Sequence, residues 1–131
     1  MAVRETGEIV STTPEYGFLL DGKWHLDGEH IEVRSPGTGQ IVGTTRRATD
    51  VHAEAAIVAA ARAFEATRRL GGYERQRVLR GVAVGVEQNR EEFSRLLALE
   101  AGKPIKTART EVDRAIFTFT VAAEEAVRIG G

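Results

Sequence analysis

Hydrophobic and polar positions change their spacing once along the chain. From Phe18 to about Arg47, short apolar clusters are separated by turn residues, a pattern that predicts small antiparallel strands. Asp21-Gly22 suits a tight hairpin turn with positive φ at both central residues. Apolar and charged residues alternate over 31–34, as in a strand with one solvated face. A two-stranded ribbon is marginal by itself, so these strands need a surface to pack on.

A helical period begins after Thr49, which is a predicted N-cap. An alanine-rich helix then runs to about Leu70, where Gly71-Gly72 should stop it. A second helix begins near Tyr73, and Asn89 with Glu92 forms a predicted capping pair for a third. The apolar stripe of the first helix comprises Val51, Ala55, Val58, Ala59 and Phe64.

The last helix follows a predicted left-handed cap at Gly102 and the helix-stopping Pro104. It should end at Gly130-Gly131. One face carries Val112, Ala115, Ile116, Phe119, Ala123 and Ala126. Short antiparallel strands followed by three or four packed helices make the expected fold class α+β. A βαβ fold is not expected, because no run of about four to eight β-branched residues follows residue 50.

Composition and charge narrow the functional classes. The 131 residues are 42% hydrophobic and 28% charged, as in a globular protein of one domain. Because 18 Lys and Arg residues nearly balance 19 Asp and Glu residues, neither nucleic acid nor an acidic membrane is an expected partner. The absence of cysteine excludes a thiol nucleophile, a thiolate metal site and disulfides on this chain. The first 20 residues contain no long apolar run, so we expect no signal peptide and a cytoplasmic location.

Three groups of glycines have simple structural interpretations. Gly37-Thr38-Gly39 lacks the third glycine of a dinucleotide fingerprint, since Val42 stands there, and predicts a turn. Gly102-Lys103 is not a phosphate loop, because Leu97 occupies the place of the first glycine. Gly81 and Gly85 predict close packing of their helix against a neighbour.

A metal site can be drawn from the histidines near residue 27. His25, Asp27 and His30 with Glu29 include suitable ligand types, but no second cluster in the sequence completes a coordination sphere. We therefore interpret these four as solvated turn residues, with no metal site.

Three stretches together resemble the aldehyde dehydrogenase superfamily. The first combines 22–24 with residues 35–42, which include the turn Ser35-Pro36-Gly37-Thr38-Gly39, although the family more often has Asn at position 35. The second is Tyr73-Glu74-Arg75 with Leu79 and Asn89, without the family's usual Trp near residue 70. The third comprises residues 99–104, Glu111-Val112 and 122–126.

This resemblance implies that residues 18–131 are the N-terminal portion of an NAD(P)-binding domain and that 1–17 are an N-terminal extension. In the family, the catalytic cysteine, the general base and the cofactor cleft come later in the chain. The chain alone is therefore expected to be inactive and to bind no cofactor. A full-length enzyme would oxidise a small aldehyde with NAD or NADP, as a homo-oligomer.

One position carries a substrate hypothesis. Glu111-Val112-Asp113-Arg114 is similar to a pattern in lactaldehyde, non-phosphorylating glyceraldehyde-3-phosphate and phosphonoacetaldehyde dehydrogenases, in which the arginine faces an anionic substrate. Arg114 could equally be solvated or paired with Glu111. Glu100 is interpreted as a structural carboxylate that holds a helix end or a neighbouring loop in place. The alternative for the whole chain is a free-standing helical interaction module with a complete core of its own.

Overall fold

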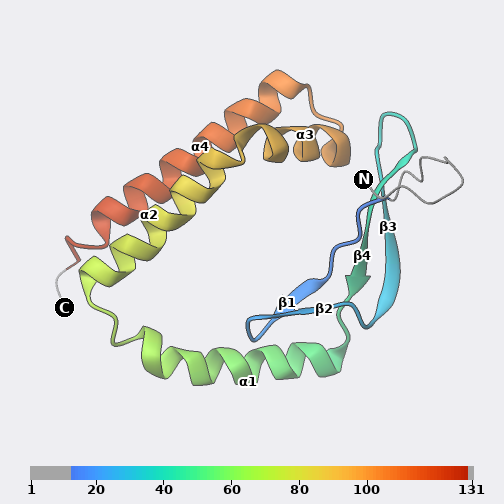
Figure 1. Ribbon diagram of the computed structural model, residues 1–131. Helices are drawn as coiled ribbons and strands as arrows, with labels where there is room; N and C mark the ends of the chain where they lie inside the picture. Colours follow the sequence, from blue (N-terminus) through green and yellow to red (C-terminus); the bar gives the residue numbers. More distant parts are fainter. Residues whose placement is uncertain (1–12, 130–131) are drawn as a thin grey trace, which may run out of the picture.

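The computed structural model describes residues 13–129, and Figure 1 shows their arrangement as two strand pairs followed by four helices. The strands are β1 (Phe18–Leu20), β2 (Lys23–His25), β3 (Glu29–Arg34) and β4 (Ile41–Arg47). The helices are α1 (Asp50–Thr67), α2 (Gly72–Gln88), α3 (Arg90–Ala101) and α4 (Ile105–Glu125). This order confirms the α+β prediction.

Both ribbons form at the turns that the sequence predicts. β1 pairs antiparallel with β2, and the turn between Leu20 and Lys23 has φ of 50° at Asp21 and 76° at Gly22. β3 pairs antiparallel with β4. Their connection is closed by the Gly39 amide, which donates to the Ser35 carbonyl at 2.8 Å. The Gly37-Thr38-Gly39 stretch is therefore a hairpin turn, as expected.

The segment before β1 belongs to the β structure. The Thr44 amide donates to the Pro14 carbonyl at 2.9 Å, and the Tyr16 amide donates to the Thr44 carbonyl at 2.8 Å. Residues 14–16 thus run beside β4, inside the range expected to be an extension. Residues 1–12 of that range lie outside the described part of the chain.

Helix boundaries follow local hydrogen bonding, and three predictions about them were wrong. α1 begins after Thr49 as predicted, but it ends at Thr67, before the glycine pair. Gly71 instead precedes α2, where its amide donates to the Glu74 carboxylate at 3.1 Å. Asn89 precedes α3, but its side chain donates to the Gly85 carbonyl at 2.9 Å and makes no cap with Glu92. The last helix likewise ends at Glu125, before the terminal glycines.

The core lies where α2, α3 and α4 pack together (Figure 1). Its buried apolar residues are small and come from α2, α4 and the turn that follows α4: Ala83, Ala108, Val112, Ala123 and Ala126. Fully buried Ser94 satisfies its hydroxyl by donating to the Arg90 carbonyl at 2.7 Å. Small side chains let the helix backbones approach closely, so the core is tight but thin.

Gly81 and Gly85 of α2 do not make the close packing contact that the sequence predicts. A Cβ built on Gly81 or Gly85 would meet no heavy atom within 4 Å, so neither glycine permits a close helix contact within the described residues. Both lie two residues from buried Ala83, which places them on the opposite side of a helix with about 3.6 residues per turn.

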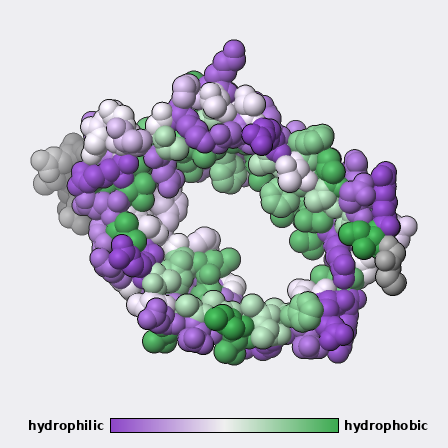
Figure 2. All heavy atoms as spheres, turned by 180° about the vertical axis from the view of Figure 1, so that it is seen from behind, coloured by the Kyte–Doolittle hydropathy of each residue, from purple (hydrophilic) through white to green (hydrophobic). Residues whose placement is uncertain are grey.

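Much apolar surface is uncovered. α1 has no buried residue, and on its apolar stripe Val51 is 77% exposed, Val58 64% and Phe64 58%. The molecule is ring-shaped, and many hydrophobic residues border its central opening (Figure 2). The described residues therefore form no complete core of the kind that a free-standing module requires. Within the same residues, no helix combines the length and hydrophobicity needed to cross a membrane.

Candidate functional site

Arg114 lies midway along α4 with an exposed side chain. Its carbonyl accepts a hydrogen bond from the Thr118 hydroxyl at 2.8 Å, which leaves the guanidinium as its only unused polar group. No residue between 13 and 129 forms an ion pair with it, and Glu111, the partner considered from the sequence, is engaged elsewhere. The guanidinium donors are therefore available to a ligand.

Glu111 is held by Lys103. The Lys103 ammonium donates to both carboxylate oxygens of Glu111, at 2.6 and 2.8 Å, and both side chains are about one third exposed. This contact ties the loop before α4 to the second turn of that helix. It explains the lysine of the Gly-Lys-Pro motif as an anchor.

Gly102 ends α3 in the left-handed conformation, with φ of 65°, as predicted. A Cβ at this position would also lie 2.8 Å from the Pro36 Cγ atom. Glycine is thus required both by the backbone angle and by the approach of the β3–β4 turn.

Two arginine–carboxylate pairs join α3 to α4. Arg90 binds both oxygens of Asp113, at 2.6 and 2.8 Å, and Arg109 binds both oxygens of Glu91, at shortest distances of 3.0 and 2.9 Å. The hydrogen bond from Arg90 lowers the pKa of Asp113, and that from Arg109 lowers the pKa of Glu91. This charged face of α3 is solvated and is also linked to α4 by the two pairs.

A cavity of about 240 Å³ separates the β3–β4 ribbon from α3. Apolar side chains dominate its lining, and Glu100 is the one charged residue among those that form it. Glu100 makes no side-chain hydrogen bond within residues 13–129, so no contact among these residues supports its expected role at a helix end or a neighbouring loop. The left-handed Gly102 and the Lys103–Glu111 contact secure that end instead.

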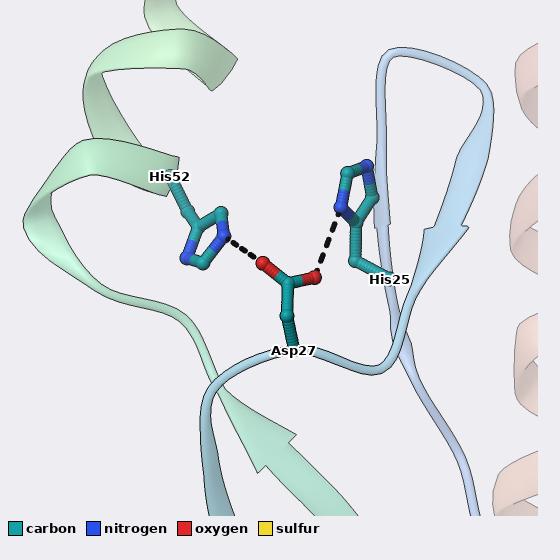
Figure 3. Close-up of side chains that lie close together, drawn as sticks. All are labelled: His25, Asp27 and His52. Atoms are coloured by element: carbon teal, nitrogen blue, oxygen red, sulfur yellow. Dashed lines mark hydrogen bonds and ion pairs between the residues drawn. The ribbon is translucent and has the colours of Figure 1, made fainter.

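His25, Asp27 and His52 converge at the junction of β2, the following loop and α1 (Figure 3). His25 Nδ1 lies 3.2 Å from Asp27 Oδ1, and His52 Nε2 lies 2.8 Å from Asp27 Oδ2. Phe18 stacks on His25 at 5.4 Å and meets His52 edge-on at 4.8 Å between ring centroids. The two imidazoles thus share one carboxylate and one aromatic wall.

The hydrogen bonds fix the tautomer of His52. The Thr49 amide can only donate, and it lies 3.0 Å from His52 Nδ1, so Nδ1 is the acceptor. Nε2 therefore carries the proton, and this N–H donates a hydrogen bond to Asp27. This hydrogen bond is the main cause of the lowered pKa of Asp27, ahead of a backbone hydrogen bond and the weaker one from His25.

This cluster differs from the group considered in the sequence. Of the four residues near position 27, the structure brings together His25 and Asp27, whereas Glu29 and His30 lie on β3, paired with Arg47 and Arg46 across the ribbon. The missed member is His52. Its position three residues after the N-cap, where a Glu or Gln would complete a capping box, was the available signal.

Comparison with known proteins gives a consistent result. Residues 24–131 match the model of the aldehyde dehydrogenase family. The 3-sulfolactaldehyde dehydrogenase of Priestia aryabhattai is 37% identical over 89% of this chain and 24% of its own length. The lactaldehyde dehydrogenase of Methanocaldococcus jannaschii is 35% identical over 80% of this chain and 22% of its own length. The chain spans about a quarter of the length of these relatives.

Solved structures agree. Aldehyde dehydrogenase 21 from Physcomitrella patens, in complex with the reaction product succinate, is 40% identical with a TM-score of 0.88, over 92% of this chain and 25% of its own. An NAD-dependent aldehyde dehydrogenase from Sinorhizobium meliloti is 34% identical with a TM-score of 0.85, over 91% of this chain and 25% of its own. The chain belongs to the aldehyde dehydrogenase family.

Proposed function

We propose that the chain serves as the N-terminal part of an NAD(P)-dependent aldehyde dehydrogenase that oxidises a small anionic aldehyde to its carboxylic acid. The observation that carries this proposal is the family match over residues 24–131. The enzyme's cysteine nucleophile and general base would come from residues outside this chain, which has no cysteine.

The anionic substrate is inferred from Arg114. A guanidinium presents several N–H donors in one plane, a geometry that matches carboxylate, sulfonate and phosphate groups. Arg114 is exposed and has no ion-pair partner among the described residues, so it would not have to break a contact to bind such a group. The names of two similar proteins are consistent with this: sulfolactaldehyde carries a sulfonate, and one carboxylate of the reaction product succinate is present before the aldehyde is oxidised. A third, lactaldehyde dehydrogenase, is named for a neutral aldehyde.

When bound to the enzyme, NAD or NADP would accept a hydride from the substrate. The residues between 13 and 129 do not fit a dinucleotide: their partial glycine motif is a hairpin turn, whereas pyrophosphate recognition uses a strand-to-helix turn. We therefore place the cofactor cleft, and the end of the domain that begins near residue 18, outside this chain. Choosing between NAD and NADP requires those residues.

Homo-oligomerisation and a cytoplasmic location complete the proposal. The apolar stripe of α1 and the hydrophobic margin of the ring favour coverage by further protein, since apolar patches of this kind mark interaction surfaces (Figure 2). The balanced charge is consistent with small-molecule partners and with neither nucleic acid nor membrane.

A chimeric enzyme tests the proposal. Residues 24–131 would replace the matching segment of the Priestia 3-sulfolactaldehyde dehydrogenase, and formation of reduced cofactor from an anionic aldehyde would be followed by absorbance. We expect the chimera to turn over, while the 131-residue chain alone does not. A folded, cofactor-binding chimera without turnover would contradict the proposal, as would turnover by the isolated chain.

A further inference from the structure

We propose that His25, Asp27 and His52 form a binding site for a divalent transition metal ion, with zinc as the best match, that fastens the β1–β2 hairpin to the start of α1. The donors are two imidazole nitrogens and one carboxylate oxygen, a set that suits zinc with water in the fourth position. This differs from the expectation of no metal site, which was made without His52.

The three donors already converge. Their ligand atoms, His25 Nδ1, His52 Nε2 and a carboxylate oxygen of Asp27, all lie within 4.8 Å of one another. Two donors on a tetrahedral zinc ion, each at about 2.0–2.1 Å from the metal, are separated by roughly 3.3–3.4 Å. The carboxylate–imidazole distances of 3.2 Å, from His25 to Oδ1, and 2.8 Å, from His52 to Oδ2, are near that value. Closing the site therefore requires side-chain rotations that bring the two imidazoles nearer to each other and to one carboxylate oxygen.

The side chains have room for that rotation. Asp27 is 63% exposed and His25 31%, so solvent reaches the centre of the cluster and an ion can enter. His52 is 17% exposed and lies in the first turn of an 18-residue helix, so it is the metal ligand whose position is most constrained. The Phe18 ring contacts both imidazoles. Each imidazole presents a ring nitrogen to the Asp27 carboxylate, which lies between them (Figure 3).

A second hydrogen-bond acceptor for His52 is also in place. To bind a metal through Nε2, the imidazole must carry its proton on Nδ1, and the Thr49 hydroxyl lies 2.9 Å from that atom. The hydroxyl oxygen can accept a hydrogen bond from this N–H, much as a metal-bound histidine usually donates its other ring N–H to an oxygen atom. The exchange needs no net loss of protons, because His25 and His52 each move a proton to their other ring nitrogen and Asp27 is a carboxylate before and after binding. The Thr49 amide is then left to water.

The position of the site gives it a structural effect. α1 buries none of its side chains, and its principal contact within residues 13–129 is with β1. Asp27 and His52 are 25 residues apart in the chain and belong to the hairpin side and the helix side of this contact. A metal ion bound by both sides would strengthen a junction that otherwise depends on the Phe18 ring, the His52–Asp27 hydrogen bond and the exposed Arg62–Asp21 ion pair.

Zinc titration of the purified 131-residue chain, in competition with a chromophoric chelator, tests the site. We expect one zinc ion per chain, and a loss of at least about tenfold in affinity in His25→Ala and in His52→Ala. His30→Ala is the matched control, because it removes the chain's only other histidine, which lies on β3 outside the cluster. That variant should bind zinc as the original chain does.

Two further measurements separate binding from folding. Zinc should raise the thermal unfolding midpoint of the original chain and of His30→Ala, because a ligand bound only to the folded state stabilises it. Asp27→Asn is nearly isosteric, and it should keep its helical circular dichroism while losing both the zinc-induced shift and the affinity. Equal affinity in the original chain and in a His25→Ala/His52→Ala double variant would overturn the proposal, and so would an equal loss in His30→Ala.

Discussion

Substitution of Arg114 by alanine provides the sharpest test of substrate recognition. The measurement requires a complete enzyme, such as the chimera with residues 24–131 of this chain. Because Arg114 is exposed and pairs with no residue between 13 and 129, its removal should change the free energy of unfolding by no more than about 0.5 kcal/mol. Any large kinetic effect can then be assigned to the substrate.

The expected magnitude follows from the lost interaction. A hydrogen bond to a charged group contributes about 1.5–3 kcal/mol, so Arg114→Ala should lower kcat/KM by roughly ten- to a hundredfold for an aldehyde that carries a carboxylate, sulfonate or phosphate. A neutral aldehyde of similar size does not use this contact, and its kcat/KM should be almost unchanged. The decisive quantity is the ratio of the two efficiencies in the variant and in the original enzyme.

Two control variants sharpen the interpretation. Arg114→Lys keeps the charge but loses the planar donors, so we expect an intermediate ratio. Arg80→Ala removes another exposed arginine, on α2, that forms no ion pair within the described residues, and it should leave the ratio unchanged. If Arg114→Ala lowers both efficiencies equally, or neither, the arginine does not recognise an anionic group.

Three other predictions concern the stability and association of the chain. In chemical denaturation, Gly102→Ala should lower the free energy of unfolding by about 1–2 kcal/mol because of its positive φ alone, and by more because the new Cβ contacts Pro36. Adding Pro36→Ala should recover only the part due to that contact, and full recovery of stability would refute the backbone argument. The lowered pKa of Asp113 means that its pair with Arg90 contributes stability above the ordinary Asp pKa, and that this stability is lost as the pH falls through the lowered value; melting temperatures should therefore decline less in acid for Asp113→Asn, and identical pH profiles would contradict the assignment. The uncovered apolar surface should cause concentration-dependent association in sedimentation experiments, whereas a compact monomer at every concentration would show that the surface needs no cover.

The sequence by itself determined the local features of this protein. The Asp21-Gly22 turn, the start of α1 after Thr49 and the left-handed Gly102 all formed as predicted. Each depends on backbone angles and hydrogen bonds within a few residues, which residue type largely controls. The family motifs could also be recognised from the sequence, because they consist of particular residue types at fixed spacing.

Tertiary structure decided which distant side chains meet. The carboxylate of Glu111 binds Lys103 and not Arg114, the partner considered from the sequence. Asp27 contacts His52, which lies 25 residues away in the chain. Spacing along the sequence does not report these distances, because they depend on how the helices and ribbons are placed in space. For the same reason the sequence could identify Gly81 as conformationally permissive but could not show that its side of α2 has no neighbour within residues 13–129.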